Sequence, residues 1–120
     1  LRSLLDFFDY ELRIIDIPPH ALHLTSICST PTDEIILVPE GYLDANVFGA
    51  LPEGCELIWM PKEEAYGCNT IGLPNNTVLI AEGYPTVKAA LEQRNLKTIE
   101  LDMSEIRAAD GSLTCCSIFY

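Results

Sequence analysis

The sequence predicts an α/β fold built from repeated strand–strand–helix–strand units, and an internal repeat is the main indication. Residues 36–42 (Ile-Leu-Val-Pro-Glu-Gly-Tyr) align with residues 78–84 (Val-Leu-Ile-Ala-Glu-Gly-Tyr), 42 positions further along the chain. The same offset matches Leu57 and Trp59 to Ile99 and Leu101 and, run backwards, to Ile15 and Ile17. Three strands are therefore expected in one register. A repeat of about forty residues is typical of stacked or radially arranged units.

Each complete unit is expected to hold two strands, a helix and a third strand. Strands are predicted at 24–29, 34–38 and 55–60 in the first unit and at 69–73, 77–81 and 97–102 in the second. Turn residues 31–33 and 74–76 separate the first two strands of each unit. Helices are predicted at 43–51 and 86–93. The second has the clearer pattern, because Val87, Ala90 and Leu91 share one face and Pro85 stands near its start.

Both ends of the chain fall inside a unit. Residues 1–8 read as the end of a helix, 12–17 as a last strand, and 113–120 as a first strand. The first residue is Leu rather than Met. We therefore expect a fragment of one domain, with a partial unit over 1–18, units over about 22–61 and 66–103, and the first strand of a closing unit over 112–120.

Composition and charge narrow the classes of function. Hydrophobic residues make up 48% and charged residues 21% of the 120-residue chain, which fits a globular protein rather than a disordered one. A net charge of −11 with only seven Lys and Arg opposes binding to nucleic acid. No apolar run approaches the ~20 residues that span a bilayer, so neither a membrane partner nor a secretory leader is indicated and a cytoplasmic location is expected.

The five cysteines indicate free thiols. Their number is odd, and they show neither C-x-x-C nor zinc-finger spacing. No disulfide framework and no metal site are therefore predicted, in keeping with a reducing compartment.

Cys115 and Cys116 follow an Asp-Gly turn at the start of an apolar run, where a thiolate can act as a nucleophile if a histidine is near. The two histidines, His20 and His23, lie about ninety residues upstream. His23 precedes the first strand of one unit, Asn69 begins the equivalent strand of the next, and Cys115 lies near the start of the third. In a radial array these positions converge, although a buried, purely structural cysteine remains the alternative.

Four motifs carry a resemblance to a known family. Leu22-His23-Leu24-Thr25-Ser26, Tyr66-Gly67-Cys68-Asn69-Thr70, Met103-Ser104-Glu105 and residues 110–117 (Asp-Gly-Ser-Leu-Thr-Cys-Cys-Ser) resemble the C-terminal half of the dimethylarginine dimethylaminohydrolase family. That family is part of the guanidine-modifying superfamily, which also contains arginine deiminases and amidinotransferases. The resemblance implies the pentein fold, a five-bladed α/β-propeller, of which this chain would form about half of the ring.

The resemblance also implies roles for individual residues. Cys115 matches the nucleophile that attacks the guanidinium carbon, and His23 matches the general acid and base. Ala109 and Asp110 match a loop that helps to hold the substrate, and Asn69 an architectural residue near the axis. Ser112 stands where the family often has glycine. No metal or cofactor is implied, and the carboxylates that grip the guanidinium lie in the N-terminal half.

Several functions stay open on this basis. The first is a thiol-dependent hydrolase that converts dimethylarginine or methylarginine to citrulline and an alkylamine. An arginine deiminase and a non-catalytic interaction module are alternatives, and a dithiol redox role is a more distant one. The expected partners are a small guanidino substrate and either the missing N-terminal half or a second copy bound through open strand edges. The isolated chain is expected to be inactive.

Overall fold

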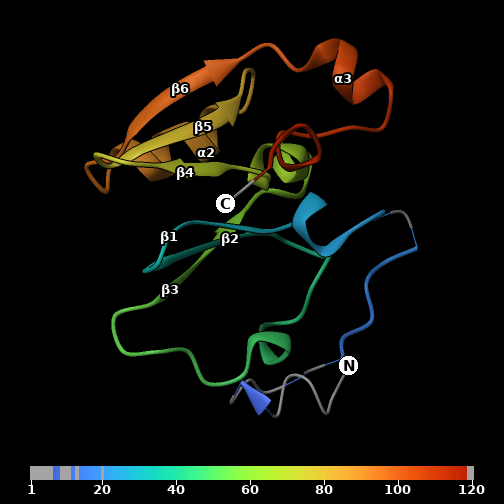
Figure 1. The fold of residues 1–120 in the computed structure, drawn as a ribbon, viewed down its shortest axis with the longest axis vertical. Helices are drawn as coiled ribbons and strands as arrows, with labels where there is room; N and C mark the ends of the chain where they lie inside the picture. Colours follow the sequence, from blue (N-terminus) through green and yellow to red (C-terminus); the bar gives the residue numbers. More distant parts are fainter. Residues whose placement is uncertain (1–6, 9–11, 13, 20, 119–120) are drawn as a thin grey trace.

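Two small mixed sheets form the centre of the molecule (Figure 1). The computed structural model describes residues 7–8, 12, 14–19 and 21–118. The first sheet contains β1 (Ser29–Thr32), β2 (Ile35–Pro39) and β3 (Glu56–Met60), and the second contains β4 (Ile71–Leu73), β5 (Thr77–Ala81) and β6 (Lys97–Leu101). In each sheet the first two strands are antiparallel and the third is parallel to the second. The predicted α/β class is therefore confirmed, and both sheets are mixed.

Helical segments connect the strands. They are η1 (Leu24–Ser26), η2 (Ala45–Phe48), η3 (Lys62–Cys68), α2 (Pro85–Glu92), α3 (Ser104–Ala108) and η4 (Thr114–Cys116). The helix predicted at 86–93 is confirmed as α2, with Pro85 at its start and Val87, Ala90 and Leu91 buried. The helix predicted at 43–51 is reduced to the 3₁₀ turn η2, because Gly49 leaves the helical region at a φ of 64°. The sequence did not predict α3.

The first strands differ from expectation. The range 24–29 forms the 3₁₀ turn η1 before β1 begins at Ser29, and the range 113–120 contains η4 rather than a strand. Side chains that bond back four residues explain this, because such bonds favour turns over strands. Cys28 Sγ lies 3.4 Å from the Leu24 carbonyl oxygen, and Ser117 Oγ donates to the Leu113 carbonyl at 2.8 Å.

Two elements were predicted near the N-terminus, a strand at 12–17 and a helix end at 1–8. Residues 12 and 14–17 are not in a strand, so the strand predicted at 12–17 is wrong for that described part. The helix end predicted at 1–8 lies mostly outside the described residues.

The repeat does not keep one register through the third strands. Ile36 pairs with Leu57, whereas its equivalent Val78 pairs with Thr98, so the third strands correspond at an offset of 41 rather than 42. The segment between the second and third strands is thus one residue shorter in the second unit. Since a one-residue slip moves side chains to the other face of a strand, Ile99 is equivalent to the buried Ile58 and not to Leu57.

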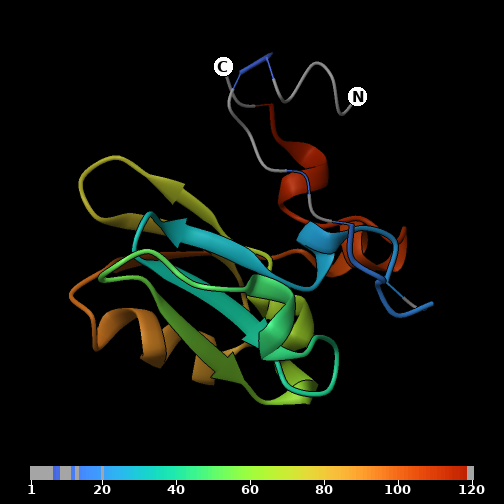
Figure 2. The ribbon, with the colours of Figure 1, turned by 90° about the horizontal axis from the view of Figure 1, so that it is seen from below.

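The two sheets share most of one hydrophobic core. Leu37 and Ile58 of the first sheet pack in the same cluster as Val78, Ile80 and Leu91 of the second unit. β1 lies against β4, where a Cβ atom on Gly72 would collide with the Pro31 carbonyl oxygen. Glycine at this position therefore permits the close approach of the two strands. Figure 2 shows α2 beside β3 as well as beside its own sheet.

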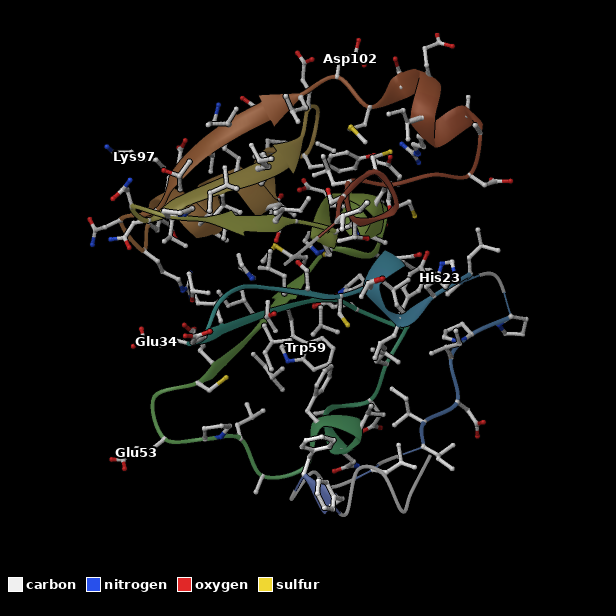
Figure 3. All side chains as sticks on the ribbon, viewed as in Figure 1. His23, Glu34, Glu53, Trp59, Lys97 and Asp102 are labelled. Atoms are coloured by element: carbon white, nitrogen blue, oxygen red, sulfur yellow. The ribbon has the colours of Figure 1, made fainter. Side chains whose placement is uncertain are left out.

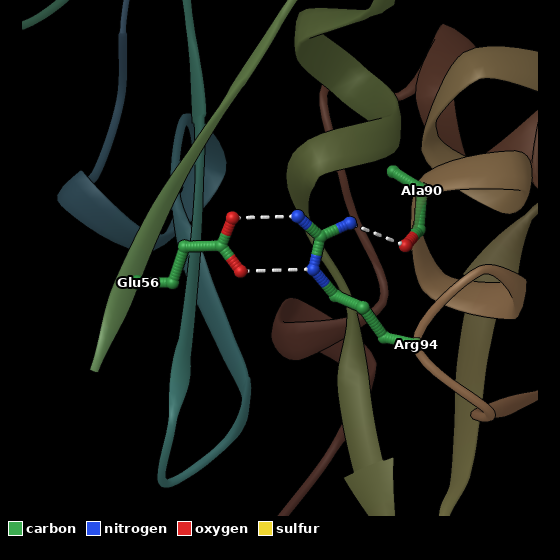
Figure 4. Close-up of polar contacts among 3 residues, drawn as sticks. All are labelled: Glu56, Ala90 and Arg94. Carbon is green, nitrogen blue, oxygen red and sulfur yellow. Dashed lines mark hydrogen bonds and ion pairs between the residues drawn. The ribbon is translucent and has the colours of Figure 1, made fainter. Parts of the chain in front are cut away.

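An ion pair joins strand β3 of the first unit to the segment after α2 in the second unit. Arg94, after α2, donates from Nε to Glu56 Oε2 at 3.0 Å and from Nη2 to Glu56 Oε1 at 2.6 Å, and its Nη1 donates to the Ala90 carbonyl at 2.9 Å (Figure 4). These bonds with the guanidinium lower the pKa of the Glu56 carboxyl. The bidentate geometry fixes the orientation of β3 relative to α2.

The 3₁₀ turns gather at one end of the sheets. In both ribbon views η1, η3 and η4 lie near one another, opposite the tips of the two β-hairpins (Figures 1 and 2). The β4–β5 hairpin turns through Asn75 and Asn76, both at positive φ (62° and 54°), as this tight turn requires. The motif residues are therefore concentrated at the end with the 3₁₀ turns.

Candidate functional site

The two residues expected to perform the chemistry lie in or beside short 3₁₀ turns. His23 is the residue before η1, with an extended backbone, and its carbonyl accepts the amide hydrogen of Ser26 at 3.1 Å. Cys115 is the middle residue of η4. Both side chains are exposed, and Figure 3 shows His23 where the chain enters η1.

One buried amide connects the segments that carry these residues. Asn69 is 1% exposed, and its Nδ2 donates both to the Thr25 carbonyl and to Thr114 Oγ1, at 2.8 Å in the second case. Its Oδ1 accepts the Thr114 amide hydrogen at 3.1 Å. Thr25 follows His23 by two positions, and Thr114 precedes Cys115 directly. Asn69 thus links the segment that follows His23 to the segment that precedes Cys115.

The loop before η4 is anchored by aromatic side chains. Tyr66 of η3 donates its hydroxyl hydrogen to the Gly111 carbonyl at 2.9 Å. The Arg107 guanidinium lies 5.0 Å from the centre of the Tyr66 ring and donates to Tyr84 Oη at 2.6 Å. Burial is the main reason why the pKa of Tyr66 is raised. These contacts hold residues 107–112 against η3.

Of the two residues expected to hold substrate, one lines a pocket and the other does not. Asp110, at a φ of 59°, lines a pocket of about 510 Å³ together with Leu22, Tyr66 and Arg107. The pocket is also lined by Lys62 and Glu63, so both signs of charge border it. Ala109 is exposed at the end of α3 and is not among the lining residues. The structure therefore places Asp110, but not Ala109, at this pocket.

The cysteines of the described chain fall into two groups. Burial raises the pKa of Cys28 to about 11 and that of Cys68 to about 12, so neither forms a thiolate readily near neutral pH. Cys115 and Cys116 are exposed instead. Both lie on the 3₁₀ turn η4, in the range where a strand was predicted.

Two residues of the site carried no predicted role. The Ser112 hydroxyl oxygen lies 3.2 Å from Cys115 Sγ and 3.5 Å from Thr114 Oγ1. Thr114 binds Asn69 through both its amide and its hydroxyl. Thr114 is part of the Leu-Thr-Cys motif, and Ser112 stands where the family often has glycine. The sequence therefore drew attention to both positions, but it did not predict their hydrogen bonds.

The described ranges were compared with two further kinds of feature, a cluster of metal ligands and a membrane-spanning helix. No group of three His, Cys, Asp or Glu side chains there is placed to hold a metal ion. Every helix of the described ranges is also too short or too polar to cross a bilayer.

The chain is similar in sequence to known proteins. No protein-family model matches it. The N(G),N(G)-dimethylarginine dimethylaminohydrolase of Pseudomonas aeruginosa is 30% identical over 99 residues, which cover 81% of this chain and 39% of that protein. The uncharacterized protein YkgA of Bacillus subtilis is 26% identical over 112 residues, covering 90% of this chain and 39% of YkgA. The chain thus spans about two fifths of the length of these relatives.

Solved structures show the same fold. Dimethylarginine dimethylaminohydrolase from Pseudomonas aeruginosa, in a mutant complexed with citrulline, matches 94% of this chain and 42% of its own with a TM-score of 0.73 and 24% identity. SxtG, an amidinotransferase from Microseira wollei in the saxitoxin biosynthetic pathway, matches 95% of this chain and 38% of its own with a TM-score of 0.78 and 20% identity.

The fold and the placement of the motif residues define the class as the α/β fold shared by the dimethylarginine dimethylaminohydrolases and the amidinotransferases. Within that class, the sequence is similar to dimethylarginine dimethylaminohydrolase, so the resemblance predicted from the motifs is confirmed.

Proposed function

We propose that this chain carries the nucleophile and the acid–base residue of a thiol-dependent hydrolase that converts dimethylarginine or methylarginine to citrulline and an alkylamine. The observation that carries the proposal is the Asn69 bridge, which joins the segments of His23 and Cys115. The similarity to a dimethylarginine dimethylaminohydrolase supports the same class of substrate. The activity of the whole protein is part of this proposal.

The proposed reaction has two steps. The Cys115 thiolate attacks the guanidinium carbon and forms a carbon–sulfur bond, and the bond to the alkylated nitrogen breaks as His23 donates a proton to the leaving amine. A water molecule then attacks the same carbon after His23 removes its proton. The carbon–sulfur bond breaks, citrulline leaves and the thiolate is restored. Asp110 and Ala109 help to hold the substrate, and no metal ion or cofactor takes part.

The same proposal implies that other parts of the protein complete the ring and the substrate site. The two units are consecutive blades of a pentein ring, and the carboxylates that bind the guanidinium come from outside this chain. The outer strand β6 exposes Ile99 (45%) and Leu101 (38%), apolar surface that the rest of the ring or a second copy would cover. We place the protein in the cytoplasm, where thiols stay reduced.

Citrulline release tests the proposed function directly. The full-length protein is assayed in parallel with dimethylarginine, arginine and agmatine, and the methylated substrate is expected to give the highest kcat/KM. The isolated 120-residue chain, assayed beside it, is expected to release none, because orientation of a substrate supplies a large part of rate acceleration. A clear preference for arginine would identify a deiminase. Absence of citrulline from every substrate would favour a non-catalytic module.

A further inference from the structure

We propose that Ser112 is a positioning residue, which donates a hydrogen bond to the Cys115 thiolate at the end of a chain of hydrogen bonds that begins at Asn69. This inference rests on the proposed function for its catalytic meaning. It concerns a position where the family often has glycine, so the hydroxyl is a property of this chain.

The direction of the chain is fixed at Asn69. The Thr114 amide can only donate a hydrogen bond, so Asn69 Oδ1 must face it. The Thr25 carbonyl can only accept one, so Asn69 Nδ2 must face the Thr25 carbonyl. Nδ2 therefore also donates to Thr114 Oγ1, at 2.8 Å. The hydroxyl hydrogen of Thr114 then points away from Asn69.

Ser112 continues the chain towards the sulfur. Its Oγ lies 3.5 Å from Thr114 Oγ1, which places it to accept the Thr114 hydroxyl hydrogen, and 3.2 Å from Cys115 Sγ. Because a thiolate can only accept, the Ser112 hydroxyl must be the donor once Cys115 is ionised. Ser112 is 4% exposed, so water competes little for this hydroxyl. A hydrogen bond to the charged form of a thiol favours that form over the neutral one.

Other groups also act on Cys115. Cys116 is adjacent on η4, and the charges of both thiols contribute to raising the pKa of Tyr66, after burial and Tyr84. The titratable or charged side chains on the segments that lead to η4 and η1 are Arg107 at the end of α3, Asp110 and His23. The test below replaces Cys116 in every protein compared and leaves the other groups unchanged, so a difference among the Ser112 variants reports the change at residue 112.

The test is the pH dependence of alkylation of Cys115 by iodoacetamide, in full-length protein carrying Cys116→Ser. Ser112→Ala and Ser112→Gly both remove the hydroxyl, and both are expected to move the midpoint to higher pH and to slow alkylation below the midpoint by about tenfold, which corresponds to one pKa unit. Ser112→Thr keeps the hydroxyl and is expected to retain the parent midpoint. Two hydroxyl-free variants are used so that a folding defect in one leaves the other to decide.

The possible results are distinct. A midpoint in Ser112→Ala and Ser112→Gly that is unchanged or lower would overturn the inference. An equal upward shift in Ser112→Thr would overturn it too, because the hydroxyl would then not be the cause. Since alkylation needs no guanidino substrate, the expected shift in a protein that releases no citrulline would uphold the hydrogen bond while refuting the proposed function.

Discussion

Loss of the Cys115 thiol is expected to abolish citrulline release. Cys115→Ser should lower kcat/KM by about a thousandfold or more, as removal of a nucleophile does. His23→Ala removes the proton donor for the leaving amine and the base for water, and should lower kcat by about 10²–10⁴-fold. Both are measured as initial rates of citrulline formation from dimethylarginine by full-length protein.

Cys116→Ser is the matched control, because it removes the neighbouring exposed thiol from the same 3₁₀ turn. It is expected to keep most of the activity. Full activity in Cys115→Ser would refute the mechanism. A larger loss in Cys116→Ser than in Cys115→Ser would transfer the nucleophile to the neighbouring residue.

Asn69 is expected to affect both stability and activity. Asn69→Ala leaves the Thr114 amide and the Thr25 carbonyl without their buried partner, and each unsatisfied group costs about 1–3 kcal/mol. We expect the free energy of unfolding to fall by about 2–6 kcal/mol and kcat to fall with it, because the histidine and cysteine segments lose their link. Urea denaturation and citrulline release measure the two effects.

The control for this prediction is Asn46→Ala, since Asn46 is an exposed amide on η2. It should change stability by less than about 0.5 kcal/mol, as exposed substitutions usually do. An Asn69→Ala variant as stable and as active as the Asn46→Ala variant would show that the bridge does not organise the site.

Local sequence patterns were sufficient for elements fixed by turn and helix signals. Strand 77–81 lies where the apolar run after the Pro-Asn-Asn turn predicts it, and α2 begins at Pro85. The first strands were misplaced because the apolar runs suggested strands, whereas Cys28 and Ser117 bond back four residues along the chain, which favours turns. The third strands were misaligned by one residue because Leu57 and Trp59 resemble Ile99 and Leu101 in character but not in pairing.

The site could be predicted only as far as the repeat and the motifs reached. Equivalent positions in successive units indicated that His23, Asn69 and Cys115 converge. Asn69 is hydrogen-bonded to Thr25 and Thr114, which lie near the other two in sequence, and the convergence of the His23 and Cys115 side chains stays a prediction. The contact between Ser112 and Cys115 depends on the backbone path of a 3₁₀ turn, which was expected to be a strand. Residues three apart approach one another in such a turn but not in a strand.

The most direct test of the central claim is to trap the covalent bond at Cys115. Full-length protein is mixed with dimethylarginine, quenched in acid within the first turnover, digested and examined by mass spectrometry. We expect a mass increase equal to the substrate less dimethylamine, located on Cys115 and lost in Cys115→Ser. Turnover without an adduct on Cys115, or with the adduct on Cys116, would contradict the proposed mechanism.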